Sequence, residues 1–357
     1  MRSMNWIAMD VHCAFCEGGW KTTRGVERGA WQVATAIPSI RAELEKVPRP
    51  RVLVIEEGPL ADWLYRELSP FVDQMIVCDP YRNALIAKDG DKDDPIDWRK
   101  LADLARGGYL RVVHHNGALD RTVLKQHVLL YHQRVKHLQA EAMRVVWWCR
   151  QFGVFIRKKD LLNPATRPEL AGRLPDVELL RKDLHLLLRG FDEAHDQVKR
   201  LRQRLARLAR GEEQIRRFMA LPGVKVVRAA TFYAVVDTPF RFKSKQALWK
   251  YMGIGLERRR SGTGPTRLCV PLRCNRVLKS MILGAAKSAS RTGRNFFAEQ
   301  HERWLADGCS TRVARRNLAR SLSAVMWGMW KSGSKFDARL AAAKSSGKQL
   351  SEAGSRR

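Results

Sequence analysis

The sequence predicts an α/β domain, then a helical coiled-coil connector, then a mainly α-helical C-terminal domain. Up to about residue 117, strand-forming runs alternate with helical periodicity, which is typical of an α/β sheet. Residues 118–217 carry two long heptad patterns, and residues 218–335 return to shorter apolar helices. The stretch 336–357 is rich in small and charged residues, and we expect it to be a flexible tail.

The order of the apolar runs predicts the elements of the N-terminal domain. The run Trp6–Met9 ends in Asp10, and a turn separates it from a second run near Gly18–Trp20, which is typical of a β-hairpin. Val52–Ile55 are four consecutive strand formers between breakers, the pattern of a strand buried on both faces of a parallel sheet. The remaining elements expected here are helices over residues 33–47 and 60–68 and a buried strand over residues 75–78.

An acidic stretch follows these strands. Residues 91–97 read Asp-Lys-Asp-Asp-Pro-Ile-Asp, which places four carboxylates together in a protein whose formal net charge is +30. Apolar residues recur at helical spacing after Pro95, so Pro95 is expected at the first helical position and Asp94 at the N-cap. Asp94 and Asp97 then project from the same helix end. The alternative interpretation is a capping acid in a solvated acidic turn.

Two further acids lie at the ends of predicted strands, Asp10 after the first and Glu56 after the buried strand 52–55. Sites in α/β sheets lie at strand ends, so these acids are expected to meet Asp94 and Asp97. Four crowded carboxylates repel one another unless about two divalent cations, Mg²⁺ or Mn²⁺, lie among them. Such an ion pair is suited to phosphodiester chemistry. Glu57 is the alternative to Glu56, because neighbouring side chains at a strand end point in opposite directions.

Composition indicates a polyanionic partner. Lys and Arg total 66 against 36 Asp and Glu, and the pI is about 10.5. Such a surplus favours nucleic acid, with a membrane surface as the other candidate. No apolar run approaches the ~18 residues of a spanning helix, and the first residues lack the apolar core of a signal peptide, so a soluble intracellular protein is expected. The seven scattered cysteines suit a reducing compartment, and the lone pair Cys13 and Cys16 does not predict a zinc site.

The connector is predicted from two heptad seams, one from Leu124 to Cys149 and one from Leu180 to Leu208. A loop with breakers, Asn163 to Pro175, joins them, so they can fold back as an antiparallel hairpin or pair between protomers; we favour some pairing between protomers. Like charges at high density on the second helix favour a bound phosphate backbone over a merely solvated face. These cations are Lys199, Arg200, Arg202, Arg204, Arg207 and Arg210.

The C-terminal domain begins at the turn Leu221–Val224, whose Pro-Gly pair can aim backbone N–H groups at a phosphate or simply connect two helices. A helix is expected from Phe240 to Tyr251. The following residues 257–264 are expected to form a basic, glycine-rich loop that presents the hydroxyl of Ser261. Arg258, Arg259 and Arg260 beside that serine are suited to binding a phosphodiester, and the alternative is a linker in which the serine is incidental.

Several short motifs occur in a characteristic order along nearly the whole chain. They are the Asp10 strand, Glu56-Glu57-Gly58-Pro59 with Tyr65-Arg66, Lys92-Asp93-Asp94-Pro95-Ile96-Asp97 with Leu101-Ala102, Leu221-Pro222-Gly223-Val224, Arg241-Phe242, Tyr251-Met252-Gly253, Ser261-Gly262, Asn275, Leu278 and Met329-Trp330-Lys331. In this order they resemble the DEDD transposases of the insertion-sequence one-ten family. The resemblance implies a RuvC-like, ribonuclease H-type N-terminal domain, a coiled-coil connector and a serine-bearing C-terminal transposase domain.

The resemblance also implies roles for individual residues. Asp10, Glu56, Asp94 and Asp97 would be the metal ligands, and Ser261 would be the nucleophile. Two residues depart from the family pattern. Cys274 stands where the family usually has Gly, and Trp98 stands where it usually has Ala after the last Asp.

Members of that family are recombinases guided by a structured bridge RNA that pairs with donor and target DNA. The implied partners are therefore both DNAs and a guide RNA, with no membrane. The length of the heptad seams, together with chemistry that cuts and rejoins several strands, predicts further copies of the chain, as a dimer that pairs into a tetramer on DNA. The implied location is the prokaryotic cytoplasm, at the nucleoid when the protein acts. Two other functions fit the residues: a RuvC-like junction nuclease in which Ser261 is structural, and a transposon-derived nucleic-acid-binding protein without activity.

Overall fold

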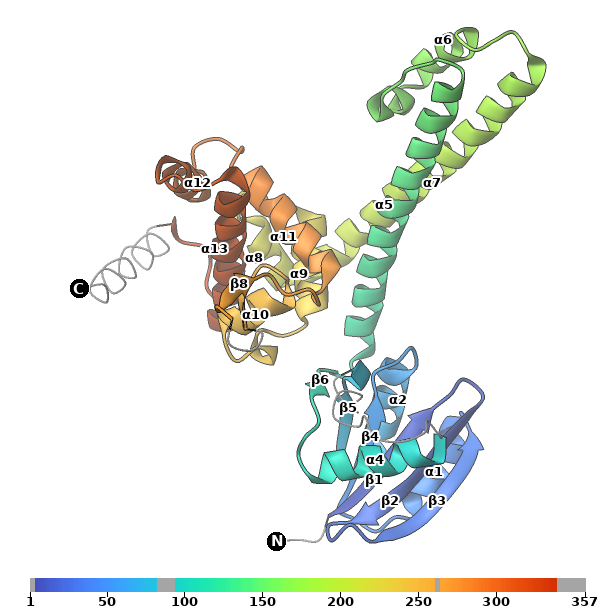
Figure 1. Cartoon of the computed structure of the whole chain (residues 1–357), viewed down its shortest axis with the longest axis vertical. Helices are drawn as coiled ribbons and strands as arrows, with labels where there is room; N and C mark the ends of the chain where they lie inside the picture. Colours follow the sequence, from blue (N-terminus) through green and yellow to red (C-terminus); the bar gives the residue numbers. More distant parts are fainter. Residues whose placement is uncertain (1–3, 82–93, 261–263, 339–357) are drawn as a thin grey trace. The chain divides into compact units, whose positions relative to one another are not determined.

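The computed structural model describes residues 4–81, 94–260 and 264–338, and the chain divides into two compact units, Met1–Thr122 and Val123–Arg357 (Figure 1). The first unit is a mixed α/β structure and the second is mainly helical, as the sequence predicted. The residues of the predicted connector and of the predicted C-terminal domain lie largely in the second unit. Among the described residues, no helix is both long and apolar enough to cross a bilayer.

The N-terminal unit contains a six-stranded sheet in the order β3-β2-β1-β4-β5-β6. The predicted hairpin is confirmed, because β1 and β2 pair antiparallel. The predicted parallel arrangement is also confirmed, because β4 runs parallel to both β1 and β5. The strands are β1 (Asn5–Val11), β2 (Phe15–Thr22), β3 (Glu27–Ala34), β4 (Arg51–Glu56), β5 (Gln74–Cys78) and β6 (Val112–Val113).

Helices cover both faces of this sheet because the central strands are apolar on both sides. Ile7 and Met9 of β1 belong to a core with α1 (Ile37–Glu45) and α2 (Ala61–Leu68). Ala8, between them, points to the opposite face, where α4 (Asp94–Arg106) packs. A short 3₁₀ turn, η1 (Ser69–Phe71), follows α2. The strand ends at β1 and β4 are therefore held between two layers of helix.

The strand β3 was not predicted, and the helix expected over residues 33–47 is shorter than expected. Val33 pairs with Cys16 and Ala34 with Phe15 in the sheet, so α1 begins only at Ile37. β3 is an edge strand whose residues alternate between exposed and half-buried. With one face in solvent and Gly, Arg and Gln in its sequence, it lacks the continuous apolar run of a buried strand.

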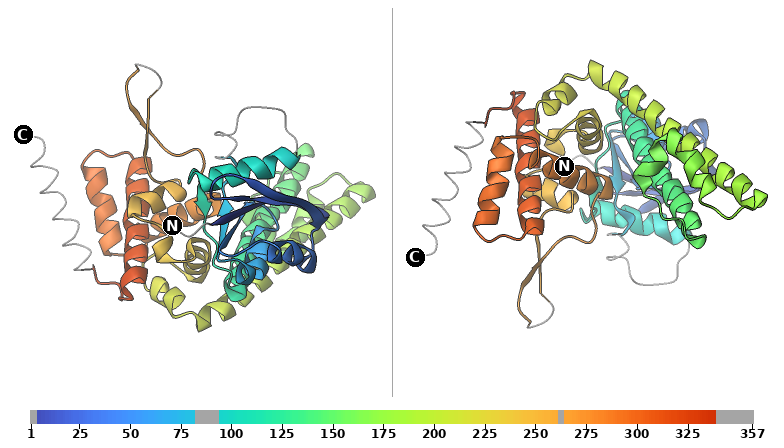
Figure 2. Two further views of the ribbon diagram at one scale, coloured as in Figure 1. Left: turned by 90° about the horizontal axis from the view of Figure 1, so that it is seen from below. Right: turned by 90° about the horizontal axis from the view of Figure 1, so that it is seen from above.

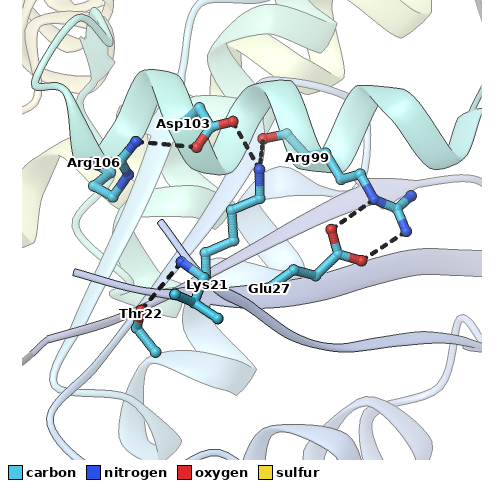
Figure 3. Close-up of polar contacts among 7 residues, drawn as sticks. Lys21, Thr22, Glu27, Arg99, Asp103 and Arg106 are labelled. Atoms are coloured by element: carbon cyan, nitrogen blue, oxygen red, sulfur yellow. Dashed lines mark hydrogen bonds and ion pairs between the residues drawn. The ribbon is translucent and has the colours of Figure 1, made fainter. Parts of the chain in front are cut away.

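A polar cluster fastens α4 to β2 (Figure 3). The Lys21 ammonium, on a residue only 8% exposed, donates to Asp103 Oδ2 at 2.7 Å and to the carbonyl of Arg99 at 3.3 Å. The Arg99 guanidinium binds both carboxylate oxygens of Glu27, at 2.9 and 2.8 Å. These hydrogen bonds from Arg99 lower the pKa of Glu27 below its usual value. The helix that begins with Asp94 and Asp97 is thus anchored to the sheet near its middle and end.

Trp98 packs directly against the backbone of β2. The residue is 2% exposed, and a Cβ atom placed on Gly19 would lie 2.3 Å from its indole ring. Gly19 therefore leaves the space that the ring fills. The departure from the family pattern at Trp98 is accommodated on the sheet side of α4, within the apolar core on that face.

Two long helices, α5 (Leu119–Gln151) and α7 (Glu178–Gly211), fold back on each other in the antiparallel hairpin that was one of the two predicted alternatives. His127 near the start of α5 contacts the carbonyl of Leu201 near the end of α7, with 3.1 Å between Nε2 and O. At the other end, Ala142 and Val145 share a core with Phe191. The pairing of these helices between protomers stays a prediction.

The connection between α5 and α7 is more structured than the expected loop. It contains two 3₁₀ turns, η2 (Lys158–Leu162) and η3 (Pro164–Thr166), and a short helix, α6 (Arg167–Gly172). Leu161 and Leu170 from these segments are buried in the core at that end of the hairpin. The breakers that suggested a loop therefore separate short helical turns.

The remaining helices pack around an aromatic cluster of Phe218, Phe232 and Trp330, whose ring centroids lie 5.3 to 6.3 Å apart. The predicted helix after the Leu221–Val224 turn is confirmed. The helices of this part are α8 (Glu213–Met219), α9 (Val226–Val236), α10 (Lys245–Tyr251), α11 (Arg276–Ala289), α12 (Phe296–Ala306) and α13 (Thr311–Ser332).

Two predictions for this part are corrected. The helix expected from Phe240 begins only at Lys245, because Ser244 caps it through Ala247 N, 3.2 Å away, and η4 (Pro239–Arg241) is a separate turn. The expected loop over residues 257–264 begins with a strand. β7 (Glu257–Arg259) pairs antiparallel with β8 (Arg267–Cys269) in a ribbon that projects from the helices (Figure 2).

Cys274 is accommodated without a glycine at its position. A Cβ atom on Gly253 would lie 2.4 Å from the Cys274 sulfur, which is too close for a side chain at position 253. Gly253 also has a positive φ of 66°, which favours glycine. Asn275 next to it still caps α11, accepting from Leu278 N at 2.9 Å. The glycine on the opposite segment therefore provides the space that the cysteine needs.

Candidate functional site

Asp10 and Glu56 lie side by side at the ends of parallel strands. Met9 of β1 pairs with Ile55 of β4, so the next residues on the two strands are these two acids. Both line one cavity of about 180 Å³, large enough for an ion with several waters. The cavity is bounded by Asp10, Val11, Cys13, Ile55, Glu56, Glu57, Gly58, Pro59, Leu60, Ala61 and Leu64.

A backbone hydrogen bond orients the Asp10 carboxylate, and an imidazole lies beside it. Oδ1 accepts a hydrogen bond from Val11 N at 2.9 Å, and Oδ2 lies 3.2 Å from His12 Nε2. Its side chain is 28% exposed, so the carboxylate is oriented by the chain yet still reaches the cavity. Carboxylate oxygens at a solvent-accessible rim are the donors that Mg²⁺ and Mn²⁺ prefer.

Asp94 and Asp97 lie in the first turn of α4, and their side chains fall outside what the structure describes. The helix begins at Asp94, one residue before the expected start at Pro95. No group of three His, Cys, Asp or Glu side chains suited to a metal occurs among the residues that are described. Two of the four predicted ligands are thus brought together, and convergence of all four stays a prediction.

A cluster beside the cavity was missed by sequence reasoning. The side chain of His115, 3% exposed, lies between two acids: Nε2 is 2.6 Å from Glu57 Oε2, and Nδ1 is 2.5 Å from Asp62 Oδ1. Tyr65 packs on the imidazole with ring centroids 5.4 Å apart. Burial alone would lower the pKa of His115, but the bonds to Asp62 and Glu57 outweigh it and raise the pKa to about 9. His115 is therefore an imidazolium that ties the residues after β4 to those before α5.

This cluster predicts a pH-dependent contribution to stability. The folded pKa of His115, about 9, lies above the unfolded value of about 6.5. The stabilisation is then complete below about pH 6.5 and is lost as the pH rises through about 9. We expect His115→Gln to lower the free energy of unfolding by on the order of 1–2 kcal/mol near neutral pH, allowing for screening of the half-exposed acids. Urea unfolding of both proteins across this range should show the difference shrinking at high pH; a constant difference would contradict the assignment.

The predicted basic face of α7 is exposed. Lys199, Arg200, Arg204 and Arg207, together with Arg202 and Arg210, all lie at the surface. Arg200 pairs with Asp196 one turn away, so one of the six charges is balanced locally. The other five cations make this surface of α7 strongly positive, which favours binding of a nucleic-acid backbone.

The residues around the predicted nucleophile are only partly described. Arg258 in β7 and Arg260 after it are exposed, and Arg260 Nε donates to the carbonyl of Gly264 at 3.2 Å. Arg259 is described in its backbone alone, and Ser261 lies outside the described residues. Arg258 and Arg259 thus belong to the β7–β8 ribbon, and Arg260 follows β7.

Comparison with known proteins gives two matches. Residues 215–302 match the model of the family described as Transposase IS116/IS110/IS902 family. Over 298 residues the chain is 25% identical to the "Putative transposase y4pF/y4sB" of Sinorhizobium fredii (strain NBRC 101917 / NGR234), an alignment that covers 82% of this chain and 76% of that protein. The matched family residues span α8 to α12 and include the β7–β8 ribbon.

Proposed function

The chain carries a transposase domain of the IS116/IS110/IS902 family, and from this premise we propose that it cleaves and rejoins DNA strands through a divalent-metal site and a serine nucleophile. DNA is the partner that a transposase implies. The single observation that carries the proposal is the placement of Asp10 and Glu56 at adjacent strand ends on one cavity.

The donor set fits hard divalent cations. Asp10 and Glu56 would bind Mg²⁺ or Mn²⁺, and Asp94 and Asp97, from the start of an anchored helix, would complete the site. The metal, when bound, supplies positive charge that stabilises the oxygens of a reacting phosphodiester. Asp10 contributes a carboxylate whose orientation the backbone of Val11 already fixes. This site, in a sheet covered on both faces, supports the RuvC-like interpretation of the N-terminal unit.

The contacts of Glu57 favour Glu56 as the metal ligand. Glu57 Oε2 is already engaged by His115 at 2.6 Å. Using Glu57 as a ligand would remove one of the two acids that neutralise a nearly buried imidazolium. Glu56 is the last residue of β4 and lies at the strand end next to Asp10. Glu57, which also lines the cavity, would therefore act as the partner of His115, and Glu56 as the metal ligand.

Ser261 would attack the phosphorus of a DNA strand, forming a phosphoserine bond and releasing one strand end as a hydroxyl. Rejoining reverses the step, with a strand-end hydroxyl displacing the serine, so that the bond energy is conserved. Arg258, Arg259 and Arg260 would hold the phosphate before and during attack. The short distance between these arginines and Ser261 along the chain supports this role.

The remaining features of the proposal follow from charge and helix pattern. The exposed cations of α7, among them Lys199, Arg204 and Arg207, would follow a nucleic-acid backbone. A structured guide RNA that pairs with donor and target DNA would supply sequence specificity. Pairing of the α5–α7 hairpins between copies would give a dimer, and two dimers a tetramer on DNA.

The test is strand exchange between donor and target DNA by the purified protein, with RNA that co-purifies removed or restored and its sequence read. We expect recombinant joints that need Mg²⁺ or Mn²⁺ and the RNA. Cleavage of branched DNA without joints would favour the junction nuclease. Binding without either reaction would leave a nucleic-acid-binding protein without activity.

A further inference from the structure

We propose that Phe240, together with Trp327 and Lys331, is a stacking site for an unpaired base of single-stranded DNA. The inference rests on the proposed function in that DNA is the partner, and it adds a binding site that neither the metal ligands nor the serine requires. It concerns η4 and α13, both within the C-terminal unit.

Phe240 is exposed on a rigid support. Phe240 is 72% exposed, whereas Phe242, two residues later, is 9% exposed and lies in the core. The turn that carries Phe240 is fixed from below, because the Trp327 indole N–H donates to the carbonyl of Pro239 at 2.7 Å. Thr238 also caps the turn by accepting from Phe240 N at 3.4 Å. The ring is therefore presented to solvent by a backbone that two contacts hold.

A cation lies beside this ring. Lys331 Nζ is 5.7 Å from the centroid of Phe240 and 4.6 Å from that of Trp327, so the ammonium lies between two aromatic side chains. No carboxylate pairs with Lys331 in the described part of the chain. An ammonium over an exposed ring, with no acid partner among the described residues, suits a phosphate next to a stacked base.

The charged residues near Phe240 indicate which kind of ligand would bind there. Residues 238–250 contain no Asp or Glu and carry Arg241, Lys243, Lys245 and Lys250. Helix α13, residues 311–332, also contains no acid. Arg241 is turned inward, donating to the carbonyl of Val235 at 3.1 Å, whereas Lys243 and Lys331 are exposed. An exposed apolar ring on a turn and a helix that carry cations and no acid complements a polyanion that has flat bases, which is single-stranded nucleic acid.

The experiment measures binding of the full-length protein to a short single-stranded DNA that contains 2-aminopurine, whose fluorescence falls when the base stacks. We expect Phe240→Ala to weaken binding about tenfold and to remove most of the quenching, in line with the loss of one stacked base. Phe240→Trp should retain both. Lys331→Ala should weaken binding and flatten its salt dependence, and Lys331→Arg should restore it.

The matched control is Phe155→Ala, since Phe155 is an equally exposed phenylalanine, at 74%, outside the C-terminal helices. It should behave as the unmodified protein. Unchanged affinity and quenching in Phe240→Ala would overturn the proposal, as would equal losses for duplex DNA. A loss confined to RNA of the same sequence would overturn the assignment to DNA. Binding is measured without catalysis, so failure of strand exchange would bear on the proposed function alone.

Discussion

Replacing Asp10 by Asn should abolish DNA strand cleavage, with a loss of about a thousandfold or more at saturating Mg²⁺. The amide keeps the shape of the side chain and its contact with Val11 N but removes the negative charge that a divalent cation needs. Glu56→Gln should have an effect of similar size, because Glu56 shares the cavity from the adjacent strand. Binding of Mn²⁺, followed by its paramagnetic signal, should weaken in both variants.

Two further variants make this result specific. Glu45→Gln, an exposed acid on α1 paired with Arg41, should leave cleavage and Mn²⁺ binding unchanged. Glu57→Gln should lower stability through His115 while retaining Mn²⁺ binding. Full cleavage by Asp10→Asn would refute the metal site, and loss of Mn²⁺ binding in Glu57→Gln but not in Glu56→Gln would exchange the roles of the two glutamates.

Ser261→Ala should eliminate the covalent protein–DNA adduct and the recombinant product together, an effect we expect to exceed about a thousandfold. The substitution removes the attacking hydroxyl, whereas the arginines beside it would still bind the phosphate. Adducts are trapped by denaturing electrophoresis of labelled donor DNA, with Ser334→Ala, an exposed serine elsewhere in the unit, as the control. DNA binding should be nearly unchanged. An adduct that persists in Ser261→Ala would refute the serine mechanism and favour the junction nuclease.

The parts of the fold that could be predicted are those in which burial imposes a local pattern. Val52–Ile55 is buried throughout, so its apolar run marked β4 and placed Glu56 at the strand end. The edge strand β3 and the ribbon β7–β8 could not be predicted, because they are not buried on both faces. They are held by backbone pairing with partners and present polar side chains to solvent.

The same distinction separates the site residues that could be predicted from those that could not. Asp10 and Glu56 could be placed because each ends a buried run on a neighbouring strand. His115 could not, because its acid partner Glu57 is 58 residues away and no local periodicity links the two. Phe240 was assigned to the helix that follows it, whereas its turn is held by a hydrogen bond from Trp327, 88 residues from Pro239. A contact between segments that are far apart in the sequence produces no periodic pattern within a short stretch of that sequence, so it could not be predicted.

The contact between Gly19 and Trp98 has a consequence for how this chain can diverge from its relatives. The indole occupies the volume of a missing side chain, so positions 19 and 98 share one space between sheet and helix. A Cβ atom on Gly19 would also lie 2.4 Å from the backbone carbonyl oxygen of Gly29, so a smaller residue at position 98 would leave a cavity without admitting a side chain at position 19. The pairing of β2 with β3 therefore requires glycine at position 19 by itself, so position 98 can change in size whereas position 19 cannot.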